Sequence, residues 1–151
     1  MDKFEIFLKA RVHVLEHVLE GGNVSDTLEI LCRDTEDIDP LMRCSVLYFD
    51  PSDMRLRHAA APSLPDYYNE AIDGLEAQVG AGSCGTAAYT GDRVIVEDVF
   101  SHPYWVPFRD LAKKVGFSAC WSQPIYSKSK DVLGTFAMYY NEVRRPTEEE
   151  I

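Results

Sequence analysis

The run Gly80–Ala88 holds the residues best suited to contact a ligand. It reads Gly-Ala-Gly-Ser-Cys-Gly-Thr-Ala-Ala and places Ser83 and Cys84 between glycines. Glycine lets the backbone approach a ligand closely, and a helix that follows presents free N–H groups to an anion. The same placement is expected to lower the pKa of Cys84 and to favour its thiolate. A tight turn that packs small residues against a sheet explains the run as well.

The segment Ser101–Arg109 is a candidate cover for that site. It reads Ser-His-Pro-Tyr-Trp-Val-Pro-Phe-Arg. Trp105 is suited to stack on a flat ligand, and Arg109 is suited to hold a carboxylate or phosphate. The alternative is that Tyr104 and Trp105 simply cover the sheet. On the first reading, the glycine-rich run and this cover enclose a cavity.

A third candidate segment is Ala119–Pro124, which has the character of a strand. Alternation along a strand places Cys120 and Ser122 on one face and Trp121 on the other. The sequence leaves open which face looks into the cavity. The predicted ligand-binding residues are Ser83, Cys84, Thr86, Asp98, Tyr104, Trp105, Arg109, Cys120 and Ser122.

Neither a metal site nor a cofactor is predicted. His13 and His17 have the i,i+4 spacing that can hold a metal on a helix, but no third ligand accompanies them. The four cysteines lie far apart, without a C-x-x-C pair, and are expected to be reduced thiols. The expected ligand is therefore an unidentified small molecule.

Composition excludes several classes of partner. The chain has 151 residues, with 15 Lys and Arg against 25 Asp and Glu, and its net charge is −10. Nucleic acid and anionic membranes need a concentrated positive field, so we expect neither as a partner. The start of the chain lacks the features of a signal peptide and no apolar run has the length of a membrane span, which favours a cytoplasmic location.

The elements that position these candidates form one α+β domain. Helices are expected over residues 3–20, where apolar residues recur every three or four positions, and after Asn23 or Ser25, with an apolar face of Leu28, Ile30, Leu31 and Cys32. Strands are expected at 44–50, 54–60, 93–97, 117–126 and 132–140, and shorter helices at 66–72 and 108–115. The natural packing is an antiparallel sheet with helices on one face and the variable segments on the other.

Both ends of the chain are expected to be helical connections. The first helix, residues 1–22, packs either on its own domain or on a second copy of the chain, which would give a homodimer. Residues 23–145 form the domain. In 146–151, Thr147 and Glu150 have the capping-box spacing that starts a helix, which predicts a connecting helix of a longer protein. A frayed acidic tail is the alternative.

Five segments in this order resemble the GAF domain family. They are Leu56–Leu64, Gly80–Ala88, Val94–Asp98, Ala119–Ile125 and Val132–Ala137. The chain is most similar to GAF modules of bacterial multidomain sensors, which are attached to histidine kinases of two-component systems or to enzymes of cyclic di-GMP signalling. The resemblance implies an antiparallel sheet with N- and C-terminal helices on one face and a ligand pocket on the other.

The function expected first is non-enzymatic sensing, in which a bound small molecule shifts the terminal helices and an output domain reads the shift. The alternative is catalysis, because Gly82–Ala87 resembles a segment of free methionine-(R)-sulfoxide reductases, with Cys84 and Cys120 as the thiol pair. However, this chain lacks a cysteine between Val99 and Ala119, where those reductases place their attacking residue. A third possibility is a ligand-free dimerisation or interaction module.

Overall fold

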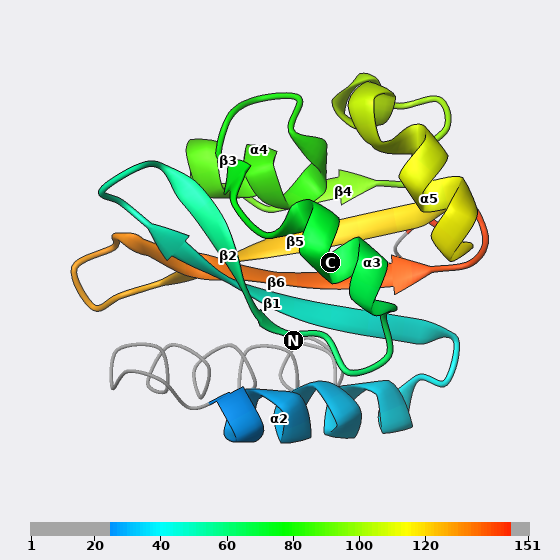
Figure 1. Cartoon of the computed structure of the whole chain (residues 1–151), viewed down its shortest axis with the longest axis horizontal. Coiled ribbons are helices and arrows are strands. Elements are labelled where there is room, and N and C mark those ends of the chain that lie inside the picture. The colour runs from blue at the N-terminus through cyan, green and yellow to red at the C-terminus, as the bar shows by residue number, and fades with distance from the viewer. Residues whose placement is uncertain (1–24, 146–151) are drawn as a thin grey trace.

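The computed structural model describes residues 25–145, and its centre is a six-stranded sheet. Every pair of neighbouring strands is antiparallel, and the strand order is β3-β2-β1-β6-β5-β4 (Figure 1). The strands are β1 (Met42–Asp50), β2 (Arg55–Ala60), β3 (Leu75–Glu76), β4 (Val94–Val96), β5 (Ala119–Tyr126) and β6 (Val132–Tyr140).

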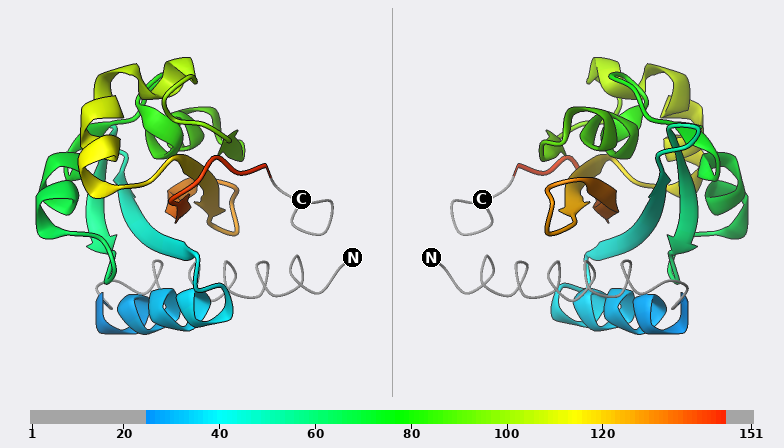
Figure 2. Two further views of the ribbon diagram at one scale, coloured as in Figure 1. Left: turned by 90° about the vertical axis from the view of Figure 1, so that its right-hand side faces the viewer. Right: turned by 90° about the vertical axis from the view of Figure 1, so that its left-hand side faces the viewer.

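Helices cover both faces of this sheet. On one face lies α2 (Ser25–Ile38), drawn in blue in Figure 1. On the other face lie α3 (Asp66–Ile72), α4 (Gly82–Thr90) and α5 (Arg109–Val115), as the edge-on views of Figure 2 show. The 3-10 helix η1 (Pro103–Phe108) leads directly into α5. The predicted α+β architecture, with a helix on one face and the variable segments on the other, is confirmed.

The central strands alternate between two hydrophobic cores. On β6, Phe136 and Met138 belong to the core beside α2, whereas Ala137 and Tyr139 belong to the core beside α3 and α4. On β5, Trp121 belongs to the α2 side and Cys120 to the opposite side. The sequence did not determine which face of Ala119–Pro124 looks into the cavity. In the structure it is the face of Cys120, which lies in the same core as Cys84 of the glycine-rich run.

One expectation about a helix was wrong, and one strand was not predicted. Ile30 was expected on the apolar face of its helix, but it is 58% exposed, whereas Leu28 and Cys32 are 2% and 0% exposed. The two-residue strand β3 was not predicted, because Leu75 and Glu76 become a strand through their pairing with Leu56 and Arg55.

Several expectations fall outside residues 25–145. These are the helix at 3–20, the dimer interface on residues 1–22 and the connecting helix at 146–151. Within the described part of the chain, no helix combines the length and the apolar character needed to cross a membrane.

Candidate functional site

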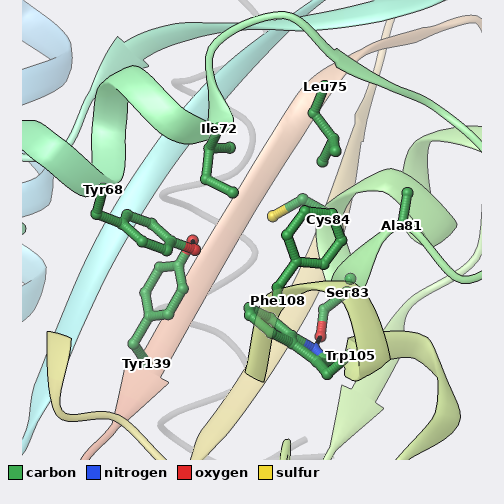
Figure 3. A pocket seen from close by; sticks show the side chains of 10 residues that line it. Tyr68, Ile72, Leu75, Ala81, Ser83, Cys84, Trp105, Phe108 and Tyr139 are labelled. Carbon is green, nitrogen blue, oxygen red and sulfur yellow. Dashed lines mark hydrogen bonds between the residues drawn. The ribbon is translucent and has the colours of Figure 1, made fainter. Parts of the chain in front are cut away.

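A small cavity lies between the sheet and the helices α3, α4 and η1. Its volume is about 10 Å³, close to what a single water molecule needs. The glycine-rich run and the Trp105 segment do meet here as the sequence predicted, but side chains fill nearly all of the space between them. The lining residues, most of them drawn in Figure 3, are Tyr68, Ile72, Leu75, Ala81, Gly82, Ser83, Cys84, Trp105, Phe108 and Tyr139.

Trp105 covers the cavity and is tied to the sheet through one serine. The indole Nε1–H of Trp105 donates to Ser83 Oγ at 3.0 Å, and the Ser83 hydroxyl donates to the carbonyl oxygen of Cys120 at 2.9 Å. Phe108 and Phe117 meet the indole edge-on, with ring centroids 6.0 and 5.4 Å away. Figure 3 shows the indole nitrogen turned toward the Ser83 oxygen. The cover is therefore held by aromatic packing and a two-step hydrogen-bond chain.

A glycine lets the α4 backbone turn beneath this tryptophan. Gly82 has φ +67°, in the left-handed region that disfavours other residues. A Cβ atom at this position would lie 3.6 Å from the Trp105 ring. Ser83 and Cys84 follow it in the first turn of α4. The glycine thus sets the direction in which these two side chains enter the cavity.

The base of the cavity is polar but uncharged. Tyr68 Oη donates to Tyr139 Oη at 3.2 Å, and Tyr139 Oη lies 3.0 Å from Ser45 Oγ. The Ser122 hydroxyl donates to Cys84 Sγ at 3.4 Å. Burial raises the pKa of Tyr68 and of Tyr139 well above the usual phenol value, so both remain protonated at neutral pH.

The expected thiolate at Cys84 is not supported. The sequence placed this residue at a helix N-terminus, which lowers a thiol pKa, but burial raises the pKa of Cys84 above its ordinary value of 9.0. Burial also raises the pKa of Cys120, and the nearby Cys84 adds to that effect. Removal from water outweighs the helix terminus here. Both thiols are therefore protonated at neutral pH.

One buried hydroxyl on the same face of the sheet lacks an oxygen or nitrogen partner and has only the Cys84 thiol, a weak acceptor, beside it. Thr135 is 0% exposed, and among the described residues its Oγ1 is the buried side-chain oxygen or nitrogen without a hydrogen bond. It lies close enough to Cys84 to influence the pKa of the thiol. A buried polar group without a partner destabilises the folded state, which makes Thr135 unusual in this core.

Other predicted site residues hold the loops rather than line the cavity. Arg109 donates from Nε to Val99 O at 3.2 Å and from Nη2 to His102 O at 3.0 Å. Asp98 Oδ1 accepts from the backbone N–H of Phe100 at 3.0 Å. These groups fix the segment that carries Trp105, and whether either contacts a ligand stays a prediction.

Thr86 and Tyr104 also lie outside the lining. Thr86 Oγ1 donates to Gly82 O at 2.7 Å and accepts from Gly80 N–H at 3.0 Å, which closes the first turn of α4. The Tyr104 ring lies 4.5 Å from that of His102. Of the nine predicted residues, those that line the cavity are Ser83, Cys84 and Trp105, while Cys120 and Ser122 lie behind them on β5.

The predicted site residues leave out most of the wall. Tyr68 and Ile72 have the i,i+4 spacing of one face of α3, and both are buried in the lining. Alternation along β6 places Tyr139 on the face that bears Ala137, so this signal was available in the sequence. Phe108 and Leu75 carried no comparable pattern.

The described residues offer no metal site. Neither His58 nor His102 lines the cavity, and no group of three or more His, Cys, Asp or Glu among residues 25–145 is placed to hold a metal ion.

Comparisons with known proteins agree with the architecture. The family model described as GAF domain matches residues 22–151. The chain is 40% identical over 147 residues to the methyl sulfide methyltransferase-associated sensor of Methanosarcina acetivorans, a match that covers 97% of this chain and 15% of that protein.

Solved structures with the same fold have low identity to the chain. The GAF domain of a phosphoenolpyruvate-protein phosphotransferase from Coxiella burnetii superimposes with a TM-score of 0.66 at 19% identity, covering 95% of this chain and 82% of that one. The free methionine-R-sulfoxide reductase of Neisseria meningitidis gives 0.65 at 17% identity, covering 92% and 76%. These two likenesses concern the fold alone, whereas the family model spans most of the sequence. The chain belongs to the GAF domain family.

Proposed function

We propose that this chain is the small-molecule-sensing domain of a signal-transduction protein, with its ligand bound beneath Trp105. The relative that is 40% identical is named as a sensor, which supports a sensory and regulatory role. The observation that carries the proposal is the cover itself. Trp105 lines the cavity and is tied through Ser83 to the central sheet, so a molecule that displaces the indole must break that tie.

A ligand larger than one water requires the cover to open. The cavity of about 10 Å³ is too small for a metabolite, and Trp105 lies on a short 3-10 helix with prolines at 103 and 107. Such helices have poorer hydrogen-bond geometry than α-helices. The structure described here is then the closed state, and a ligand shifts the population toward an open state.

Strand β5 offers a route from the cavity to the C-terminal end of the domain. The carbonyl of Cys120 accepts the Ser83 hydroxyl on one face of the sheet, and the next residue, Trp121, donates from its indole to the carbonyl of Arg144 on the other face. Opening of the cover thus disturbs the Cys120–Trp121 peptide unit, and the side chain of Trp121 also holds the segment before residue 146. We also propose that this domain contacts an output domain and a second copy of the chain through its terminal helices.

The reductase alternative has less support. Sulfoxide reduction needs a nucleophilic thiolate, whereas burial raises the pKa of both Cys84 and Cys120. Free methionine sulfoxide, the substrate in the name of the Neisseria enzyme, carries an ammonium and a carboxylate group. No charged side chain is among the residues that line this cavity. Burial of such charges without partners is strongly unfavourable.

Native mass spectrometry combined with thermal melting tests the proposal. The 151-residue chain is equilibrated with pooled charged and uncharged metabolites, and we expect a retained mass together with a raised Tm. Ile72→Phe fills the cavity and should abolish both effects, whereas the smaller Ile72→Val should keep them. If no molecule from any pool is retained and the Tm of the wild-type chain never changes, the sensing role is contradicted. The alternative of a ligand-free dimerisation or interaction module is then favoured.

A further inference from the structure

The direction of the hydrogen bonds at Ser83 restricts what a ligand can offer. A carbonyl oxygen accepts and never donates, so the bond to Cys120 O, at 2.9 Å, takes the proton of the Ser83 hydroxyl. On the cavity side, Ser83 Oγ can therefore only accept. In the closed state it accepts the indole N–H of Trp105, which is itself only a donor.

Displacement of Trp105 leaves this acceptor buried and without a partner. Ser83 is 0% exposed and Trp105 is 3% exposed, so bulk water does not reach Ser83 Oγ directly in the closed state. A buried polar group that loses its hydrogen bond is costly, and a ligand that restores the bond is favoured over one of the same shape that does not. The site therefore selects for a donor.

The rest of the lining selects against charge. Apart from hydroxyl and thiol groups, the wall consists of aliphatic and aromatic side chains such as Ile72, Leu75 and Phe108. Burial keeps Cys84 and the tyrosines in their protonated forms, since it raises their pKa values. An ionised ligand would find no opposite charge among these residues.

We propose that the ligand is an uncharged, largely apolar molecule with an N–H or O–H donor, which replaces the Trp105 indole on Ser83 Oγ. This inference rests on the proposed function and adds to it the ligand class and the residue that selects it. Pure acceptors such as thioethers, ethers and nitrate are rejected by the same geometry.

Two probes of nearly equal size separate donor recognition from mere filling of space. Phenol carries an O–H donor, and fluorobenzene has a similar shape without a donor. The readout is the indole N–H resonance of Trp105 in a ¹⁵N-labelled 151-residue chain, which contains two tryptophans. Trp105→Phe assigns the resonance by its disappearance. Ser63→Ala is the control, because that hydroxyl donates to Glu36 Oε1 at 2.7 Å and Ser63 does not line the cavity.

We expect phenol to shift the Trp105 resonance saturably and to bind at least about tenfold more tightly than fluorobenzene, the factor that one hydrogen bond supplies. Ser83→Ala should abolish the preference, while Ser63→Ala should keep it. Equal displacement of Trp105 by both probes would overturn the donor requirement and leave the covered ligand cavity intact. If neither probe moves the resonance, the inference also falls, and the Ile72→Phe comparison decides independently whether the sensing role survives.

Discussion

The indole N–H of Trp121 donates to the carbonyl oxygen of Arg144 across 3.3 Å, and this bond holds the segment that follows β6 against the sheet. The Arg144 guanidinium lies over the Tyr140 ring, 4.3 Å from its centroid, and pairs with Asp39 at 3.4 Å. The backbone N–H of Arg144 also donates to Glu97 O at 3.1 Å. The chain thus leaves the domain from a defined position.

Trp121→Phe should loosen this segment. The substitution keeps an aromatic ring beneath Arg144 but removes the indole N–H, so we expect a loss of about 1 kcal/mol of unfolding free energy. Backbone amides of residues 141–145 should exchange faster with deuterium. Unchanged exchange at these amides would mean that the segment is held by contacts other than the Trp121 indole, such as those with Asp39 and Glu97.

A double-mutant cycle tests whether the cover and the C-terminal segment are coupled. Trp105→Phe removes the bond to Ser83, and Trp121→Phe removes the bond to Arg144, on opposite faces of β5. Because the Trp105 bond reaches the carbonyl of Cys120 through Ser83, and the other bond starts from the side chain of the next residue, Trp121, we expect a coupling free energy of at least about 0.5 kcal/mol in urea unfolding. Strictly additive effects would remove β5 as the route of transmission.

Thr135→Val should stabilise the ligand-free domain. The substitution nearly preserves shape and removes a buried hydroxyl whose polar neighbour is the weakly accepting thiol of Cys84. We expect a gain of about 1 kcal/mol, or a rise of roughly 2–4 °C in Tm. Thr86→Val is the control, because it deletes a hydroxyl bonded to Gly82 O and Gly80 N–H and should destabilise the domain. A loss of stability in Thr135→Val would show that the hydroxyl has a partner, such as a buried water.

Much of the fold was predictable because it depends on local pattern. The helix Asp66–Ile72 and the strand Val132–Tyr140 have the bounds expected from turn residues and alternation. By contrast, β3 exists through its pairing with Arg55 and Leu56, a contact between segments some twenty residues apart that no local pattern reveals. The side of β5 that faces the cavity was also undetermined until the sheet order was known.

The site was predictable in its position but less so in its chemistry. The glycines around Ser83 and the aromatic residues around Trp105 predicted that these two distant segments meet. In the structure Trp105 donates a hydrogen bond to Ser83. Arg109 was expected to meet an anion, yet its donors bond to backbone carbonyls of its own loop. The pKa of Cys84 was expected to fall, because helix position can be read from sequence, whereas burial depends on the whole fold.

The raised pKa values predict a loss of stability at alkaline pH. Burial raises the pKa of Cys84 above 9.0, and of Tyr68 and Tyr139 well above 10.0, so the unfolded chain releases these protons at a lower pH than the folded one. Their contribution is complete below pH 9 and declines as the pH rises toward the folded-state pKa values. The slope reaches about 1.4 kcal/mol per pH unit for each group that is ionised in the unfolded state alone.

Urea unfolding between pH 7 and 10.5 measures this decline, and two substitutions attribute it. Tyr139→Phe and Cys84→Ser each remove one titrating group, so each should make the alkaline decline shallower even where it lowers stability at pH 7. Phe100→Leu is the control, since Phe100 is 40% exposed and the change removes no titrating group. If the variants lost stability above pH 9 as steeply as the wild-type chain, Cys84 and Tyr139 would have to ionise in the folded state. The cavity beneath Trp105 would then accommodate charge, and the restriction to uncharged ligands would fail with it.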